Sequence, residues 1–370
     1  RLKRCLKHFL PPTVPCHSSH VHTAEMWRAA VPVFACAAVG ALAGSHNCTG
    51  QPGEACGLSD ADPLLQQSVK RSPWLDVYVS TAETIEDIMY WAVLYKSMKP
   101  YYHAHPHWLL IRKDSELMKR AHAIRLAIGQ NFWHARLDVF DPKALNLESV
   151  ESGTFRQLGV FQYSPDEYRR VVNIDADSLV FSNIDHMTHR IPHMILAREQ
   201  GDCRNLTQTL LNEQPATNLM SMVPDTSVVN LLTTATLRLY ASNDSRRENV
   251  SHANLVSRAY SRIHPEQVQG SFHPTEVVSA TCLMHHRDQV LKNKKVLENM
   301  RVVHLGRDGR RLINDIITHG EKRLLNTLSG LQQAGKASLS HSLQSWFECF
   351  ASQQVKGIIE AAKNGPLGES

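Results

Sequence analysis

The central part of the chain alternates short apolar runs with stretches whose apolar residues recur at helical spacing. Short runs rich in β-branched residues are typical of buried strands, and the recurring pattern is typical of amphipathic helices. Strands separated by helices predict a parallel sheet with right-handed crossovers. The predicted strands are residues 77–81, 108–111, 137–140 and 171–174, and the predicted helices between the first three are residues 86–98 and 115–128.

The pattern is weaker in the later part of the chain. Residues 199–220 are polar and are interpreted as an insertion, whereas residues 223–232 are expected to return to the sheet. A helical pattern covers residues 321–362, whose apolar side chains include Leu343 and Trp346 and can pack on the preceding domain. The other predicted elements are strands at 191–196 and 300–305 and a helix at 254–263.

Two carboxylates follow the predicted strand at 171–174. Asp175-Ala176-Asp177 places acidic side chains at positions i and i+2 beyond the strand end, where both can converge on one hard cation. In open parallel sheets, ligands gather beyond the carboxyl ends of the strands. The sequence therefore predicts a ligand site at this position.

The passage around these carboxylates carries a wider pattern. Tyr168, an apolar strand, Asp175-Ala176-Asp177, a serine, Leu-Val and then Asn-Ile-Asp at 183–185 follow one another. This order resembles the DxD region of the glycogenin-like retaining glycosyltransferases, glycosyltransferase family 8, which have the GT-A fold. The resemblance extends over residues 74–310 and implies an α/β fold: a GT-A-like mixed, mostly parallel sheet flanked by helices, here with a helical C-terminal extension.

The same resemblance implies a metal-dependent, retaining transfer of a hexose from a UDP-sugar to a hydroxyl of a glycan, protein or lipid. In the family both DxD carboxylates and a late histidine hold Mn²⁺ or Mg²⁺. Val302-Val303-His304-Leu305-Gly306 matches the context of that histidine. The resemblance thus implies that Asp175, Asp177 and His304 bind one cation, and we expect their side chains to converge within about 6 Å, since such bonds are near 2.1 Å.

Further residues correspond to donor contacts of the family. Ser80 and Thr81 end the predicted first strand, where the family has a small polar turn that contacts the nucleotide, and Arg156 lies near the place of a donor-contacting basic residue. Where the family has a diphosphate-binding lysine, this chain has three arginines, Arg307, Arg310 and Arg311, any one of which could take that role. An arginine can bind phosphate oxygens bidentately. The implied donor-binding residues are Ser80, Thr81, Arg156, Asp175, Ala176, Asp177, Gly306 and Arg307.

Two motifs of the family are altered. The closest string to its Asn-Ser-Gly is Thr226-Ser227-Val228, and no acid stands near His252, where the family carries an Asp-Gln close to the transferred sugar. The catalytic residue is therefore unassigned. Two alternatives stay open: a haloacid-dehalogenase-like phosphohydrolase that uses Asp175 as nucleophile, and a secreted nucleotide-sugar-binding protein that has lost turnover.

His103, His105 and His107 alternate and would project to one side of an extended segment. Pro106 and the lack of nearby carboxylates favour a solvated loop over a metal site.

Composition adds little about partners. The net charge of +5, from 40 basic and 35 acidic residues in a chain of 370, includes no long basic run and gives no sign of nucleic-acid binding. The expected partners are the UDP-sugar donor and the acceptor, with membrane contact only if the N-terminal apolar segment is an uncleaved anchor.

The N-terminal region has the features of a secreted protein. Residues 26–43 have a basic start, an apolar run and Ala-Leu-Ala at the end, which predicts a signal peptide. Residues 1–25 are interpreted as translated upstream sequence and residues 44–73 as a linker. The transferase domain is expected over residues 74–320 and the helical extension over 321–370.

Four Asn-x-Ser/Thr sequons, at Asn47, Asn205, Asn243 and Asn249, agree with passage through the secretory pathway. The predicted location is the Golgi or ER lumen, or outside the cell. Five cysteines follow the signal peptide, so at least one lacks an intramolecular partner.

Overall fold

The computed structural model describes residues 75–101, 105–145, 159–188, 194–198, 215–241, 252–266, 269–273, 275–288 and 299–367. These residues belong to one compact unit, residues 68–370. The predicted signal peptide, the linker, the four sequons and Arg156 lie outside the described residues. Within the described residues no helix combines the length and the apolar character that a membrane span requires.

The main sheet has seven strands in the order β3-β2-β1-β4-β7-β6-β8. Neighbouring strands are parallel from β3 to β4, and among the strands described in this sheet only β7 runs in the opposite direction. The mixed, mostly parallel sheet predicted from the sequence is therefore confirmed. The strands are β1 (Leu75–Ala82), β2 (His107–Arg112), β3 (Ala135–Phe140), β4 (Tyr168–Ile174), β6 (Met194–Arg198), β7 (Pro215–Met222) and β8 (Gly270–Ser271).

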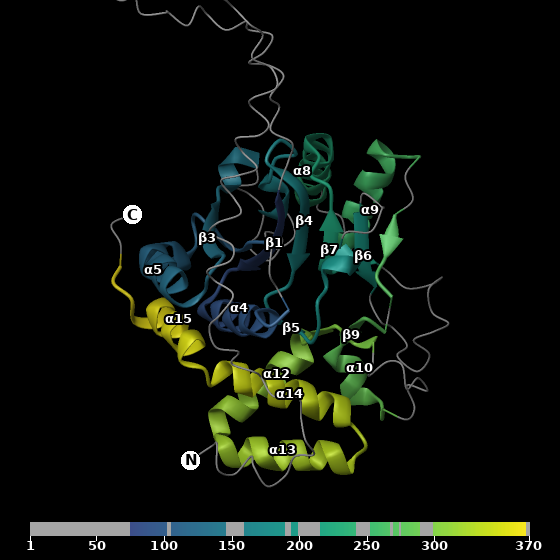
Figure 1. The fold of residues 1–370 in the computed structure, drawn as a ribbon. Helices are drawn as coiled ribbons and strands as arrows, with labels where there is room; N and C mark the ends of the chain where they lie inside the picture. The colour runs from purple at the N-terminus through teal and green to yellow at the C-terminus, as the bar shows by residue number, and fades with distance from the viewer. Residues whose placement is uncertain are drawn as a thin grey trace, which may run out of the picture. The chain divides into compact units, whose positions relative to one another are not determined.

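Helices cover both faces of this sheet (Figure 1). Strand β2 is buried along its length because its side chains alternate between two cores: Leu109 and Ile111 pack on one face, Trp108 and Leu110 on the other. A strand covered on both faces needs a continuous apolar run, which is the pattern in the sequence. The first face is covered by α4 (Ile85–Met98) and α5 (Ala121–Asn131), the second by α8 (Thr226–Ala241) and α9 (His252–Ile263).

A second sheet of three strands lies beside the carboxyl end of β4 (Figure 1). Its central strand β10 (Val302–His304) pairs antiparallel with β5 (Ser178–Val180) and parallel with β9 (Val277–Ser279). The short helix α7 (Asp185–Thr188) follows β5, α10 (Ala280–His285) follows β9, and α12 (Gly306–His319) follows β10. The small sheet therefore joins the chain after β4 to a segment more than a hundred residues later.

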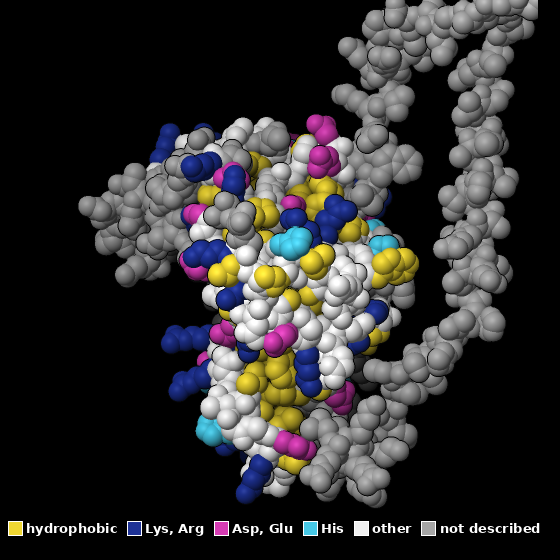
Figure 2. All heavy atoms as spheres, turned by 90° about the vertical axis from the view of Figure 1, so that its left-hand side faces the viewer, with side chains coloured by type: hydrophobic (Ala, Val, Ile, Leu, Met, Phe, Trp, Pro, Cys, Tyr) yellow, Lys and Arg dark blue, Asp and Glu magenta, His cyan; other side chains and the backbone are white. Residues whose placement is uncertain are grey.

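The C-terminal helices α13 (Glu321–Gln333), α14 (Ala337–Phe350) and α15 (Gln353–Asn364) confirm the predicted helical extension. Helices α14 and α15 are part of the core, whereas α13 has no buried residue. Leu343, Trp346 and Ile358 are fully buried in the same apolar cluster as α4 and α5. On the side of α5 and α15, Figure 2 shows apolar side chains in patches among charged and polar ones, as expected for an ordinary protein surface.

Three elements differ from the sequence predictions. Residues 223–232 do not form a strand: α8 begins at Thr226, where Asp225 Oδ1 accepts a hydrogen bond of 2.7 Å from the Ser227 N–H as a helix N-cap. The helix predicted over 115–128 is a 3₁₀ turn, η2 (Glu116–Arg120), followed by α5. The segment interpreted as an insertion ends in β7, a strand of the main sheet.

The prediction of a solvated histidine loop is wrong for His107. This side chain begins β2 and is fully buried, with its Nε2 2.9 Å from the Ser80 hydroxyl. Burial lowers the pKa of His107 to about 3, so the imidazole is neutral. Of the other two histidines in that run, His105 is half-buried and His103 lies outside the described residues.

Candidate functional site

Hydrogen bonds at the end of β4 fix the two carboxylates. The Asp175 N–H donates to the Asn218 carbonyl on β7 at 2.9 Å, which extends the β4–β7 pairing by one residue. The chain then turns, and the Ser178 N–H donates to the Asp175 carbonyl at 3.0 Å. Asp175 and Asp177 therefore stand on one tight turn between β4 and β5.

His304 reaches this turn through the small sheet. Its position in β10 is opposite Ser178, the residue directly after Asp177. The next N–H, that of Leu305, donates to the Asp177 carbonyl at 2.9 Å. The pairing of β10 with β5 thus places the histidine beside the carboxylates, although these residues are far apart in the sequence.

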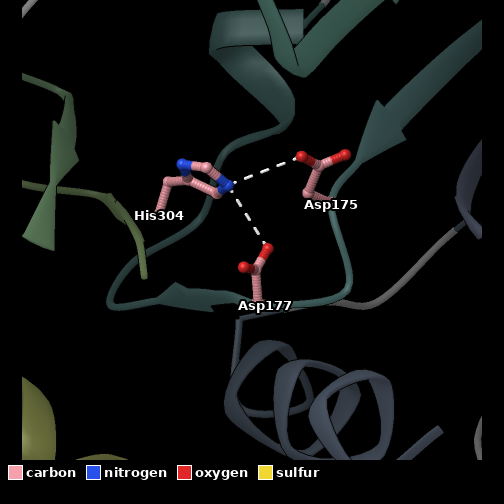
Figure 3. Close-up of side chains that lie close together, drawn as sticks. All are labelled: Asp175, Asp177 and His304. Atoms are coloured by element: carbon pink, nitrogen blue, oxygen red, sulfur yellow. Dashed lines mark ion pairs between the residues drawn. The ribbon is translucent and has the colours of Figure 1, made fainter. Parts of the chain in front are cut away.

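The three side chains point toward one another (Figure 3). The Nε2 atom of His304 lies 3.5 Å from Asp175 Oδ2 and 3.3 Å from Asp177 Oδ1. One ligand atom from each residue lies within 4.8 Å of the others. The predicted convergence of Asp175, Asp177 and His304 is confirmed.

Arg310, on α12, holds the opposite side of Asp177. Its Nε donates to Asp177 Oδ2 at 2.7 Å, and an Nη donates to Asp87 Oδ1 at 2.9 Å. The guanidinium carbon lies 4.7 Å from the centre of the Tyr90 ring on α4, a cation–π distance. Asp177 is therefore bonded on one oxygen by arginine and faces histidine with the other.

Charge in this cluster shifts the titration of its members. Burial opposes the charge on His304, but Asp177 and Asp175 outweigh it and raise the pKa of His304 from 6.5 to about 10. Burial likewise opposes the charge on Asp177, yet His304 and Arg310 hold the pKa of this carboxyl well below its usual value. Without a metal, the site is a compact network of charged groups at neutral pH.

The carboxylate oxygens of Asp175 and Asp177 and the imidazole nitrogen of His304 are suitable ligands for a divalent cation. Mn²⁺ accepts carboxylate oxygen and imidazole nitrogen, and Mg²⁺ binds proteins through one or two carboxylates. Asp175 and Asp177 each direct one oxygen toward the His304 Nε2, so a cation between them would replace the proton that the imidazole carries. Three protein ligands leave further positions of an octahedral ion open to a substrate.

A cleft of about 540 Å³ lies along α12 and includes Arg310, the residue that bonds Asp177. It is lined by Arg307, Asp308, Arg310, Arg311 and Asn314, all from α12. The first N–H groups of a helix have no partner inside the helix, and its dipole favours negative charge there. Arginines and a helix N-terminus together make this cleft suited to an anion beside the candidate metal ligands.

The structure locates most of the predicted donor-binding residues near this site. Gly306 begins α12 with φ +58°, a conformation that favours glycine, and Arg307 is exposed in the cleft. Ala176 is buried in the turn. Ser80 and Thr81 are also buried, and the Ser80 hydroxyl donates to the Ile174 carbonyl at 2.6 Å. Their contact with a donor stays a prediction, as does that of Arg156, which lies outside the described residues.

Sequence reasoning missed two residues of the site and did not single out a third. Arg310 was one of three arginines, with Arg307 and Arg311, that could take the phosphate-binding role, and nothing in the sequence distinguished it. Asp87 had the signal of a helix N-terminus, since Thr84 stands three residues before it, but nothing linked it to a residue more than two hundred positions later. Asn218 lay inside the presumed insertion.

No protein-family model matches this chain, and no curated protein sequence matches it. At low identity, it is similar to solved structures of glycosyltransferases. The apo form of GlyE from Streptococcus pneumoniae is 13% identical with a TM-score of 0.45, over 80% of this chain and 66% of that one. The galactosyltransferase LgtC with donor and acceptor sugar analogs is 13% identical with a TM-score of 0.41, over 74% of this chain and 100% of that one.

Mouse xyloside xylosyltransferase 1 in its apo form is 11% identical, with a TM-score of 0.40, over 64% of this chain and 98% of that one. The chain spans just under two thirds of the length of the GlyE structure. Identities and TM-scores this low assign neither a family nor an activity. The function therefore has to be argued from the site.

Proposed function

We propose that the protein is a metal-dependent glycosyltransferase that moves a hexose from a UDP-sugar to a hydroxyl of a glycan, protein or lipid. One observation carries the proposal: Asp175, Asp177 and His304 converge beyond the central strand β4, next to an arginine-lined cleft. UDP as the nucleotide and retention of configuration rest on the DxD resemblance of the sequence.

The reaction needs a stabilised leaving group. Negative charge develops on the nucleoside diphosphate as the sugar–oxygen bond breaks, and a bound divalent cation supplies compensating charge there. Asp175, Asp177 and His304 would hold that cation, Mn²⁺ or Mg²⁺. The N-terminus of α12 and Arg307 would bind the phosphate oxygens that face the cleft.

The acceptor side departs from the family's pattern. Thr226-Ser227-Val228, the string closest to the family's Asn-Ser-Gly, is the first turn of α8, and residues 242–251, just before His252, lie outside the described residues. Because the sequence has no acid near His252, where the family has an Asp-Gln close to the transferred sugar, a nucleotide-sugar-binding protein without turnover is the second candidate. The phosphohydrolase reading is weaker, because it leaves His304 and its two ion pairs without a role.

The proposed place of action is the lumen of the secretory pathway or the cell exterior. The signal-peptide pattern and the sequons support it. Cys282 takes part in a disulfide bond, and such bonds persist in oxidising compartments.

A donor-hydrolysis screen over nucleotide sugars, with Mn²⁺ or with a chelator, tests the activity. We expect release of UDP from one UDP-sugar in Mn²⁺ alone, loss of release in Asp175→Asn, and full release in Asp315→Asn. Asp315 is a matched control because it lies on α12 and pairs with Arg323. Cleavage of simple phosphate esters without a nucleotide would indicate a phosphohydrolase instead. UDP binding without release would indicate the binding protein.

A further inference from the structure

Arg310 is held from three directions. Asp177 and Asp87 accept its hydrogen bonds, and the Tyr90 ring lies under the guanidinium. The close approach of α12 to its neighbours keeps the helix in place: a Cβ on Gly309 would stand 2.9 Å from Leu305 Cβ and 3.3 Å from Ala280 Cβ. The side chain is only 19% exposed. Arg310 is therefore built into the site as a fixed part and is not a mobile surface arginine.

Asp87 is the anchor of this arrangement. It caps α4: its Oδ2 accepts hydrogen bonds from the N–H groups of Glu83 and Thr84 and from the Thr84 hydroxyl, at 2.9 to 3.1 Å. The carboxylate is thus fixed on one oxygen by the helix start and offers Oδ1 to Arg310. A charged hydrogen bond to a buried, already fixed partner holds the guanidinium in one orientation.

The consequence falls on Asp177. Its Oδ2 is bonded to Arg310 Nε, while its Oδ1 faces His304. A metal bond from Oδ2 would have to compete with this charged hydrogen bond, whereas Oδ1 has no arginine on it. The arrangement therefore favours monodentate binding of a cation by Asp177.

We propose that Arg310 is a positioning residue that selects small octahedral cations over Ca²⁺ by keeping Asp177 monodentate. The inference rests on the proposed function, since it concerns the cation of the same site. Mg²⁺ demands near-octahedral geometry at about 2.1 Å, and Mn²⁺ binds in octahedral sites of the same ligand type. Ca²⁺ takes six to eight oxygens at about 2.3–2.6 Å, with carboxylates often bidentate. Loss of the second Asp177 oxygen as a ligand therefore weakens the binding of Ca²⁺ more than the binding of Mg²⁺ or Mn²⁺.

The test is the ratio of Ca²⁺ to Mn²⁺ dissociation constants, measured by calorimetric competition without nucleotide. Variants are Arg310→Gln, Arg310→Lys and Asp87→Asn, with Arg311→Gln as control. Arg311 is exposed and one residue away, so its loss removes the same charge without releasing Asp177. Lysine keeps the charge of Arg310 but lacks the fork that joins two carboxylates.

Arg310→Gln is expected to strengthen the binding of Ca²⁺ relative to that of Mn²⁺ by about tenfold, equivalent to about 1.4 kcal/mol. Arg310→Lys and Asp87→Asn should shift the ratio in the same direction. Arg311→Gln should strengthen both ions alike and leave the ratio unchanged, because removing a nearby positive charge favours any cation.

An unchanged ratio in Arg310→Gln, or an equal shift in Arg311→Gln, would overturn the inference. If Arg310→Gln does not fold in thermal unfolding, Arg310→Lys decides by the same ratio. Failure of the metal site on which the proposed function rests looks different, because the wild-type protein would then bind neither cation.

Discussion

Replacing Asp177 by Asn should destabilise the metal-free protein far more than replacing Asp175 by Asn. Both changes remove one negative charge from the same candidate ligand set. The two carboxylates differ in surroundings: the side chain of Asp177 is 5% exposed and lies between His304 and Arg310, whereas that of Asp175 is 34% exposed and, among the described residues, pairs with His304 at 3.5 Å.

The structure sets the size of each effect. Removing one partner of a buried ion pair leaves its counterpart uncompensated and costs about 3–5 kcal/mol. The Asn amide oxygen can still accept the hydrogen bond from Arg310, so we expect the lower end, about 3 kcal/mol, for Asp177→Asn. An exposed ion pair contributes about 0.2–1 kcal/mol, which is the loss expected for Asp175→Asn.

Urea unfolding in the presence of a chelator measures the free energy of unfolding of each metal-free variant. Repeating it with Mn²⁺ measures how much metal binding adds to that free energy. Each variant should lose the stabilisation that Mn²⁺ gives the wild-type protein. Equal losses of stability in the two metal-free variants, or a loss of less than about 1 kcal/mol in Asp177→Asn, would refute the network described around Asp177.

Three further outcomes follow from the same structure. In the metal-free protein the pKa of His304 is raised from 6.5 to about 10, so its contribution to folding stability should be complete below pH 6.5 and lost as pH rises through about 10. The pKa of Asp177 is lowered from 3.8, so its contribution to stability should be lost on acidification below that usual pKa. Urea midpoints measured across pH check both effects, and a stability that does not fall at alkaline pH would contradict the first. Ser80→Ala removes the hydroxyl that joins β1 to the Ile174 carbonyl and should cost about 1–3 kcal/mol in urea unfolding, whereas no change would mean that this bond does not hold the strand end. Leu343→Ala, in the buried face of α14, should cost about 2–5 kcal/mol, whereas Leu325→Ala, 45% exposed on α13, should cost about 0.5 kcal/mol or less; similar values would show that α14 does not belong to the core.

The sequence was most informative where the signal was local. The apolar runs predicted the strands β1, β2 and β4 because a strand buried on both faces must be apolar along its length. Strand β3 was predicted as well, although only Leu137 and Phe140 of its side chains are buried. Asp175 and Asp177 could be recognised because they follow such a strand directly. His304 could be predicted only through the resemblance, since no local pattern tells a metal-ligating histidine from a structural one.

The rest depended on contacts between distant segments. The valines and leucines of residues 223–232 could belong to a strand or to one face of a helix. The N-cap at Asp225, with burial of one helix face, decides for α8. His107 looked polar but is fully buried beside Ser80. The bond between Arg310 and Asp87 spans 223 positions, and no spacing rule reaches that far.

Titration calorimetry with UDP, in Mn²⁺ and in a chelator, tests the central claim most directly. The site predicts UDP binding that requires Mn²⁺, because the diphosphate would meet Asp175 and Asp177 and needs a cation between them. Bound to the native state alone at a hundredfold excess over its dissociation constant, UDP should then add about 2.7 kcal/mol of stability. Metal-independent binding of UDP, or no binding at all, would contradict the account.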